Sequence, residues 1–156
     1  LTHRFCVRYY KFLVNAKKWN PKSTGEQIIQ GYLSTDKERV VRVRVKGAKA
    51  FLTIKGNQQG ISRTEMEYEI PVEDAKVLME MCLDNPIEKV RYREEIAGKI
   101  WEIDVFDGKN KGLILAEVEL ESEGETVEIP EWVTEEVSTD KRYFNAWLSN
   151  HPFLNW

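Results

Sequence analysis

Four short segments of this chain carry a charged residue at every second position. Two are basic and two are acidic: Arg42-Val43-Arg44-Val45-Lys46, Lys89-Val90-Arg91-Tyr92-Arg93, Glu65-Met66-Glu67-Tyr68-Glu69 and Glu117-Val118-Glu119-Leu120-Glu121. Side chains alternate between the two faces of a strand, so each segment presents like charges on one face and apolar groups on the other. A sheet with both kinds of stripe could bind a polyanion through its basic residues and a divalent metal through its acidic residues.

The composition is that of a globular protein with a high share of charge. The chain has 156 residues, of which 42% are hydrophobic and 31% are charged. This length predicts a single domain over residues 1–156. The formal net charge of -3 conceals 23 basic and 26 acidic residues. It gives no support for nucleic acid or an anionic membrane as a partner, and we expect neither.

The cysteines and the apolar segments bear on where the protein works. Cys6 and Cys82 are too few for a disulfide framework or a cysteine metal site, which predicts a reducing compartment, the cytoplasm. No apolar run approaches the ~18–20 residues of a membrane span, and no secretory signal is visible. The chain starts with Leu1 rather than methionine, from which we expect a trimmed or altered N-terminus.

Alternation and turn signals predict a chain built mainly from strands. The expected strands cover residues 4–14, 28–33, 39–46, 50–55, 62–70, 87–95, 99–106 and 113–121. Turn residues such as Gly47, Gly56 and Ala97-Gly98 separate them. Many consecutive strands joined by short turns favour an antiparallel sheet closed into a barrel.

Two helices are expected beside these strands. The first covers residues 71–82, because proline and acidic residues occupy its first turn and apolar residues recur at helical spacing. The second covers residues 140–148, after Ser138 or Thr139 as the capping residue.

Alternation alone does not decide which face of the sheet points inward. The simpler interpretation is a half-buried sheet with its charges in water. Two observations favour a charged lumen instead. The two helices could cover the opposite, apolar face, and the charges segregate by strand, whereas a surface that serves solubility mixes signs. Burying such charges costs free energy unless they pair or bind ligands, so the lumen would be a functional site.

Nine fragments, in order along the chain, resemble the CYTH superfamily, the triphosphate tunnel metalloenzymes. They are Lys11-Phe12-Leu13-Val14, Gln30-Gly31-Tyr32-Leu33, Arg42-Val43-Arg44, Thr53-Ile54-Lys55, Arg63 with Glu65 and Glu67, Lys89-Val90-Arg91-Tyr92, Glu102-Ile103-Asp104-Val105-Phe106, Ala116-Glu117-Val118-Glu119 and Asp140-Lys141-Arg142-Tyr143. The superfamily includes inorganic tripolyphosphatases, thiamine triphosphatases and class IV adenylyl cyclases. The resemblance implies a mainly β (α+β) fold: an eight-stranded antiparallel closed tunnel barrel with flanking helices.

The first strand departs from the family pattern, which is Glu-x-Glu-x-Lys. Lys11 matches the lysine, but Val7 and Tyr9 stand at the two glutamate positions. No acidic residue precedes Glu26, so a small shift in register cannot restore the pair. Two explanations stay open: loss of the pair in this lineage, or alteration of the segment by engineering.

The resemblance also implies roles for the basic residues. Arginine forks match phosphate oxygens bidentately, and lysines act as point charges. We expect four residues to act in catalysis: Lys11, Arg42, Arg44 and Lys55. The expected substrate-binding set adds Arg63, Lys89, Arg91 and Lys141. Lys46 and Arg93 are more simply explained as solvated charges.

The acidic residues form the expected metal site, with Mg²⁺ or Mn²⁺ as the cofactor. Glu117 and Glu119 lie on one face of a strand and could hold such an ion together. Asp104, Glu65 and Glu67 are further candidate ligands. For Glu65 and Glu67, pairing with the lysines and arginines of the lumen is an equally good interpretation.

These expectations predict metal-dependent hydrolysis of a linear triphosphate, either inorganic tripolyphosphate or a nucleoside triphosphate, impaired by the loss of the glutamate pair. The alternatives are a nucleotide enzyme like the class IV adenylyl cyclases and an inactive or engineered polyphosphate-binding tunnel. His3 and His151 are too few for a histidine-based catalytic triad or zinc site. Trp147, Phe153 and Trp156 either pack the C-terminal segment onto the barrel or support a homodimer.

Overall fold

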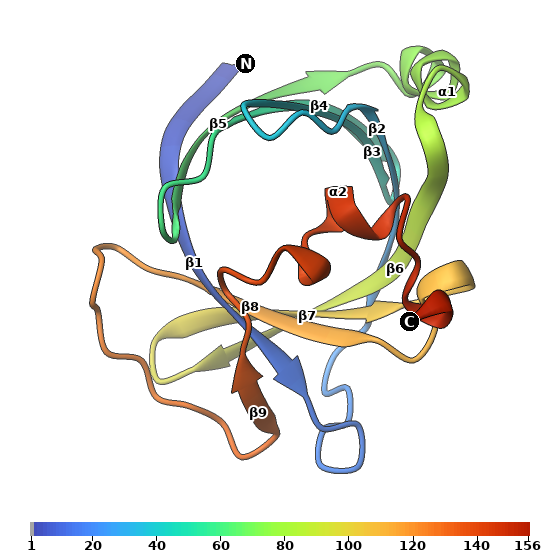
Figure 1. The fold of residues 1–156 in the computed structure, drawn as a ribbon. Coiled ribbons are helices and arrows are strands. Elements are labelled where there is room, and N and C mark those ends of the chain that lie inside the picture. The colour runs from blue at the N-terminus through green and yellow to red at the C-terminus, as the bar shows by residue number, and fades with distance from the viewer. Residues whose placement is uncertain (1) are drawn as a thin grey trace.

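Eight antiparallel strands close into a barrel in the computed structural model, which describes residues 2–156 and the side chains from Val7 onward. The strands are β1 (Thr2–Val14), β2 (Glu26–Ser34), β3 (Arg39–Lys46), β4 (Lys49–Gly56), β5 (Ser62–Ile70), β6 (Leu83–Ile96), β7 (Lys99–Phe106) and β8 (Ile114–Glu119). The long first strand closes the barrel, because its first half pairs with β5 and its second half with β8. Figure 1 shows the resulting ring of strands. The predicted closed antiparallel barrel is confirmed.

The largest differences from the predicted strands concern the start of one strand and the presence of another. Strand β6 begins at Leu83, so it includes the Asn85-Pro86 dipeptide that signalled a break after the first helix. A ninth strand, β9 (Val133–Glu136), was not predicted, and it adds to β1 beside β8. Its segment carries mostly polar and acidic residues without an apolar face, so the sequence offers no alternation to detect.

Side-chain alternation places the charged residues of the strands in the lumen. On β3, Arg42 and Arg44 are buried and point inward, opposite Thr53 and Phe51 of β4. The same alternation turns Lys89 and Arg91 of β6, and Glu117 of β8, towards the same interior. The interpretation of the charges as a lumen rather than a solvated surface is therefore the right one.

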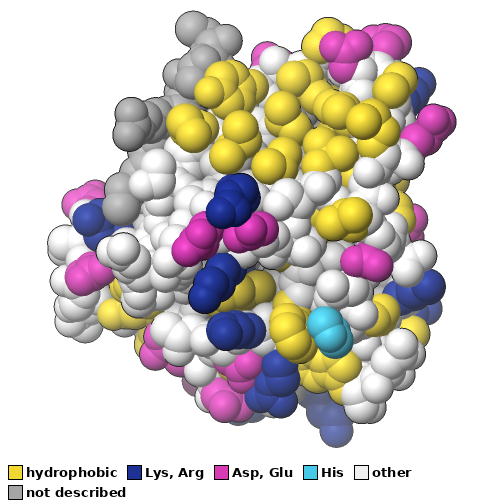
Figure 2. Space-filling model, turned by 45° about the horizontal axis from the view of Figure 1, so that its top comes forward, with side chains coloured by type: hydrophobic (Ala, Val, Ile, Leu, Met, Phe, Trp, Pro, Cys, Tyr) yellow, Lys and Arg dark blue, Asp and Glu magenta, His cyan; other side chains and the backbone are white. Residues whose placement is uncertain are grey.

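The helix α1 (Val72–Glu80) packs against the outside of β2, β3 and β4. Its Ala75 is fully buried against Val43 and Ala50, which lie on the outward face of β3 and β4. Beyond α1, outward side chains of these strands stay half-buried, and Figure 2 shows hydrophobic side chains gathered on this upper face of the barrel. The helical prediction for residues 71–82 is confirmed within a few residues at each end.

The outer face of β7 and β8 is covered without a helix, contrary to expectation. Trp101, Ile103 and Val118 are buried there beneath two other tryptophans, Trp19 and Trp132. Trp19 lies in the β1–β2 connection and Trp132 directly before β9. The indole N–H of Trp19 donates to the buried carboxylate of Glu94 at 2.9 Å. Two tryptophans from loops thus cover an outer face for which the sequence analysis expected a helical cover.

The C-terminal segment is not one helix over residues 140–148. It consists of a 3-10 turn, η2 (Lys141–Tyr143), the short helix α2 (Asn145–Leu148) and a second 3-10 turn, η3 (Phe153–Asn155). Asp140, rather than Ser138 or Thr139, caps the first turn through its side chain. Figure 1 shows α2 inside the ring of strands, not outside it.

An apolar cluster holds α2 in that position. Leu148 and Tyr143 pack against inward-facing residues of the strands, among them Tyr32, Ile87 and Phe106. This cluster fills one part of the lumen with apolar side chains and leaves the charged part open. Within residues 2–156, no helix is long and apolar enough to cross a membrane.

Candidate active site

A cavity of about 850 Å³ occupies the charged part of the lumen. Among the described side chains, ten lysines and arginines and five glutamates line it. All eight predicted substrate-binding residues are in that lining: Lys11, Arg42, Arg44, Lys55, Arg63, Lys89, Arg91 and Lys141. The excess of basic residues makes the cavity suited to a compact polyanion.

Arg42 and Arg44 hydrogen-bond to uncharged side chains, and Arg42 also lies 3.8 Å from the Glu67 carboxylate. Both nitrogens Nε and Nη2 of Arg44 donate to the Gln30 side-chain oxygen, at 2.9 and 2.7 Å. Nη2 of Arg42 donates to the Thr53 hydroxyl at 3.1 Å, and its Nε has no hydrogen-bond partner among the described residues. Burial, with the neighbouring Arg42 and Arg91, lowers the pKa of Arg44 to about 9. A bound anion would relieve this repulsion.

A buried ion-pair network fixes the two basic residues of β6. Nζ of Lys89 lies 2.7 Å from Oδ2 of Asp104, and Nε of Arg91 lies 2.7 Å from Oδ1 of the same carboxylate. Burial alone would raise the pKa of Asp104, but the charges of Arg91 and Lys89 hold it well below its usual value. Asp104 therefore stays ionised behind the cavity wall.

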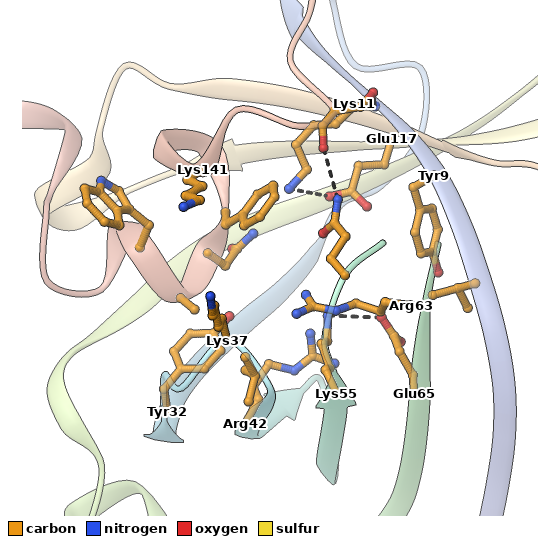
Figure 3. A pocket seen from close by; sticks show the side chains of 18 of the residues that line it. Tyr9, Lys11, Tyr32, Lys37, Arg42, Lys55, Arg63, Glu65, Glu117 and Lys141 are labelled. Atoms are coloured by element: carbon orange, nitrogen blue, oxygen red, sulfur yellow. Dashed lines mark hydrogen bonds and ion pairs between the residues drawn. The ribbon is translucent and has the colours of Figure 1, made fainter. Parts of the chain in front are cut away.

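Two further lysines of the lumen pair with glutamates. Nζ of Lys55 lies 3.3 Å from Glu65, and Nζ of Lys11 lies 3.3 Å from Glu117. Burial, with the nearby Arg42, lowers the pKa of Lys55 to about 7, although Glu65 opposes this shift. Figure 3 shows both pairs inside the cavity. The interpretation of Glu65 as a partner of a basic residue accordingly has direct geometric support.

Tyr9 stands among the acidic side chains of the cavity. Its phenol has a raised pKa because it is buried and faces the negative charges of Glu65, Glu117, Glu119 and Glu102. In Figure 3, Tyr9 and Glu65 lie on one side of the cavity, and Lys37 and Lys141 on the other. The cavity is thus polarised, with an acidic side around Tyr9 and a basic side towards the C-terminal segment.

The metal-binding capacity of the acidic side rests on Glu119 and Glu117. Burial and the neighbouring Glu102 and Glu65 raise the pKa of Glu119, and no basic side chain in the described part of the chain forms an ion pair with it. A carboxylate repelled by others favours a cation beside it. Over residues 7–156, however, no three acidic, histidine or cysteine side chains gather as a preformed metal site. The donors suit a hard cation only if ligand oxygens complete its shell.

The structure places the remaining predicted residues as follows. Glu67 lines the cavity and lies 3.8 Å from Arg42. Asp104 is not in the lining, because Lys89 and Arg91 stand between it and the cavity. Val7 is buried in the wall, at a position where a carboxylate would face Arg63 of β5.

Some residues in or beside this cavity were not predicted to act there. The Asn145 side-chain oxygen accepts hydrogen bonds from Lys89 at 3.1 Å and from Gln30 at 3.2 Å, which ties α2 to the basic residues. Lys11 donates to the Tyr143 carbonyl at 3.1 Å. Gln30 was the easier residue to find, because it is a polar residue between the buried Ile28 and Tyr32 on one face of its strand. Asn145 carries no such signal.

Residues 8–145 match the model of the CYTH domain. The chain belongs to the CYTH family. An inorganic triphosphatase of Acetivibrio thermocellus is 43% identical over 146 residues, which is 93% of this chain and 94% of that protein. An inorganic triphosphatase of Nitrosomonas europaea is 38% identical over 124 residues, covering 77% and 82%.

Solved structures agree with this placement in the CYTH family. The crystal structure of the inorganic triphosphatase NE1496 superimposes with a TM-score of 0.68 at 32% identity, covering 92% of this chain and 93% of that one. A putative adenylate cyclase from Bacillus halodurans has a TM-score of 0.64 at 14% identity, covering 77% and 83%. The similarity to the putative adenylate cyclase shows a shared fold and nothing more.

Proposed function

We propose that this CYTH protein hydrolyses a linear triphosphate inside the barrel, with inorganic tripolyphosphate as the preferred substrate. The observation that carries the proposal is the cavity itself, in which ten basic side chains face five acidic ones. Its relatives named inorganic triphosphatases, which cover most of the chain, support the same reaction. A triphosphate carries several negative charges in a short span, which matches this density of basic groups.

The basic residues would do most of the catalytic work, because phosphoryl transfer requires positioning and charge neutralisation more than covalent chemistry. Arg42 and Arg44 would grip phosphate oxygens from β3, while Lys89 and Arg91 would do so from β6. Lys11, Lys55, Arg63 and Lys141 would complete the ring of contacts. Hydrogen bonds to Thr53 and Gln30 orient these forks, and neither of these two partners carries a charge.

Glu117 and Glu119 are the residues that would hold Mg²⁺ or Mn²⁺, together with phosphate oxygens of the substrate. A divalent ion so bound neutralises phosphate charge and lowers the pKa of a bound water. Asp104 would act instead by fixing Lys89 and Arg91. Glu65 and Glu67 would keep Lys55 and Arg42 in place.

The first strand would weaken metal binding. Val7 and Tyr9 remove two carboxylates relative to the family pattern, and a protonated phenol is a poor ligand for a hard cation. Because Tyr9 faces Glu65, Glu117 and Glu119, a carboxylate at this position would join the acidic group directly. We therefore expect the chain to bind triphosphate well and to turn it over slowly.

The test is phosphate release from tripolyphosphate and from ATP with Mg²⁺ or Mn²⁺. The chain is compared with the double variant Val7→Glu/Tyr9→Glu and with a Val7→Gln/Tyr9→Gln control, which has similar shape without the charge. We expect slow turnover by the chain, faster turnover by the glutamate variant and no gain in the glutamine variant. Activity that is absent from the first two proteins, despite tight tripolyphosphate binding, would identify a binding tunnel rather than an enzyme. Formation of cyclic AMP from ATP would instead support the cyclase alternative.

A further inference from the structure

The basic side of the cavity ends in an aromatic surface. Trp147 of α2 lines the same cavity as the phosphate-binding residues, together with His151. The indoles of Trp19, Trp101 and Trp132 are buried, whereas Trp147 and Trp156 are exposed at 38% and 48%, and of these two only Trp147 lines the cavity. An exposed apolar ring is unexpected in a cavity lined by charged side chains, and it suggests contact with a ligand.

The plane of the Trp147 ring is fixed by its neighbours. The His151 imidazole stacks on the indole, with the ring centroids 3.8 Å apart and the planes inclined by only 9°. The next residue, Leu148, is fully buried in the apolar cluster inside the barrel and anchors α2 there. With His151 covering one side, the exposed surface of the indole is flat and held in place. Such a surface costs little entropy when a ring binds to it.

The helix that carries Trp147 is hydrogen-bonded to one of the expected phosphate-binding residues. Asn145, two residues before Trp147, accepts hydrogen bonds from Lys89 and Gln30. An α-helix rises about 1.5 Å per residue, so Trp147 lies only a short distance along α2 from the contact with Lys89. A ligand whose phosphate chain lies against Lys89 could therefore place an attached ring at Trp147.

We propose that Trp147, backed by His151, is a stacking platform for the base of a nucleoside triphosphate whose phosphates lie in the tunnel. The inference rests on the proposed function, because the same basic residues hold the phosphates. Bases stack on aromatic side chains through their π-faces, with little dependence on sequence. Lys37, Lys46 and Lys141 also line the cavity, and their charge disfavours a cationic ring, which leaves a neutral nucleobase as the fitting occupant.

The test is isothermal titration calorimetry of ATP, CTP and tripolyphosphate, in EDTA so that metal-dependent turnover does not interfere. The wild-type chain is compared with Trp147→Leu, which keeps an apolar side chain without a π-face, and with Trp147→Phe, which keeps a ring. We expect Trp147→Leu to weaken binding of ATP and CTP by roughly 5- to 100-fold. Tripolyphosphate affinity should change by less than about twofold, and Trp147→Phe should retain most of the nucleotide affinity.

The Arg42→Ala variant separates the platform from the phosphate site, because it should weaken all three ligands. If it does so, but Trp147→Leu leaves ATP binding unchanged or weakens tripolyphosphate equally, the platform is overturned and the proposed function stands. A wild-type chain that binds none of the three ligands would overturn both. Equal loss of nucleotide affinity in Trp147→Phe and Trp147→Leu would also contradict stacking, since phenylalanine keeps a π-face.

Discussion

Nζ of Lys89 lies 2.7 Å from Oδ2 of Asp104, and both side chains are almost fully removed from solvent. The same carboxylate receives two hydrogen bonds from Arg91, at 2.7 and 2.9 Å. Asp104 therefore pairs with two positive charges inside the barrel, and Arg91 also lies 3.4 Å from Glu102. Asp104 makes it possible to keep two basic side chains buried beside each other.

Removing this carboxylate should destabilise the fold. In Asp104→Asn, Lys89 and Arg91 lose their shared counter-charge while they stay buried, and breaking a buried pair in this way costs about 3–5 kcal/mol. The free energy of unfolding, measured by urea denaturation, should fall by that amount. Asp36→Asn is the control, because it breaks an exposed pair with Arg39 and should cost less than about 1 kcal/mol. Equal effects of the two substitutions would contradict a structural role for the buried network.

Removing one arginine fork should weaken substrate binding. Arg42 lines the cavity, so a phosphate oxygen bound there would gain a charge-assisted hydrogen bond from its guanidinium group. Such a bond contributes about 1.5–3 kcal/mol, so Arg42→Ala should weaken tripolyphosphate binding by roughly 10- to 100-fold. Arg39→Ala, on the same strand but outside the cavity lining, should leave the dissociation constant within about twofold. Similar losses in both variants would argue against a specific role for Arg42.

Neutralising Glu119 should weaken metal binding. Its carboxylate is repelled by Glu102 and Glu65, and an ion bound there with substrate oxygens would relieve that repulsion. We expect Glu119→Gln to raise the Mn²⁺ concentration needed for half-maximal tripolyphosphate turnover by about tenfold or more. Glu123→Gln, an exposed acid that accepts a hydrogen bond from Ser62, is the control. An unchanged Mn²⁺ requirement in Glu119→Gln would show that the ion binds elsewhere.

The affinity for triphosphate should fall as the pH rises through neutrality. The pKa of Lys55 is lowered to about 7 by burial and by the positive charge of Arg42, so its amine is charged below pH 7 and increasingly neutral above it. Only the charged form attracts phosphate, and loss of this one proton can reduce affinity by at most about tenfold per pH unit.

The comparison with Lys55→Arg isolates this contribution. Arginine keeps its charge throughout the range, so the variant should lose the Lys55-dependent decrease between pH 6 and pH 8. The ionisation of tripolyphosphate itself affects both proteins equally and cancels in the ratio of their dissociation constants. Parallel pH profiles for the two proteins would rule out titration of Lys55 as the cause.

Much of the barrel could be predicted from the chain alone, because side chains of a strand alternate with a period of two. Arg42 and Arg44 must share a face, and so must Glu117 and Glu119. The hairpin turn at Ala97-Gly98 was also predictable from Gly98, which adopts a φ of 77° without the steric cost that a side chain would add. The same local rules do not specify what covers each outer face. The burial of Trp101 under Trp132 depends on a segment that carries no strand pattern of its own.

Residue order and backbone geometry are enough to specify the charged residues, their sharing of strand faces and their resemblance to the CYTH superfamily. The partners of these residues depend on how the whole chain packs. Lys89 meets Asn145 across 56 residues of sequence, and Lys11 meets the Tyr143 carbonyl across 132. These contacts exist because Leu148 and Tyr143 bury apolar surface inside the barrel and bring α2 with them. Burial is a property of the whole packed chain, so the placement of Trp147 at the cavity emerges only when the barrel closes around α2.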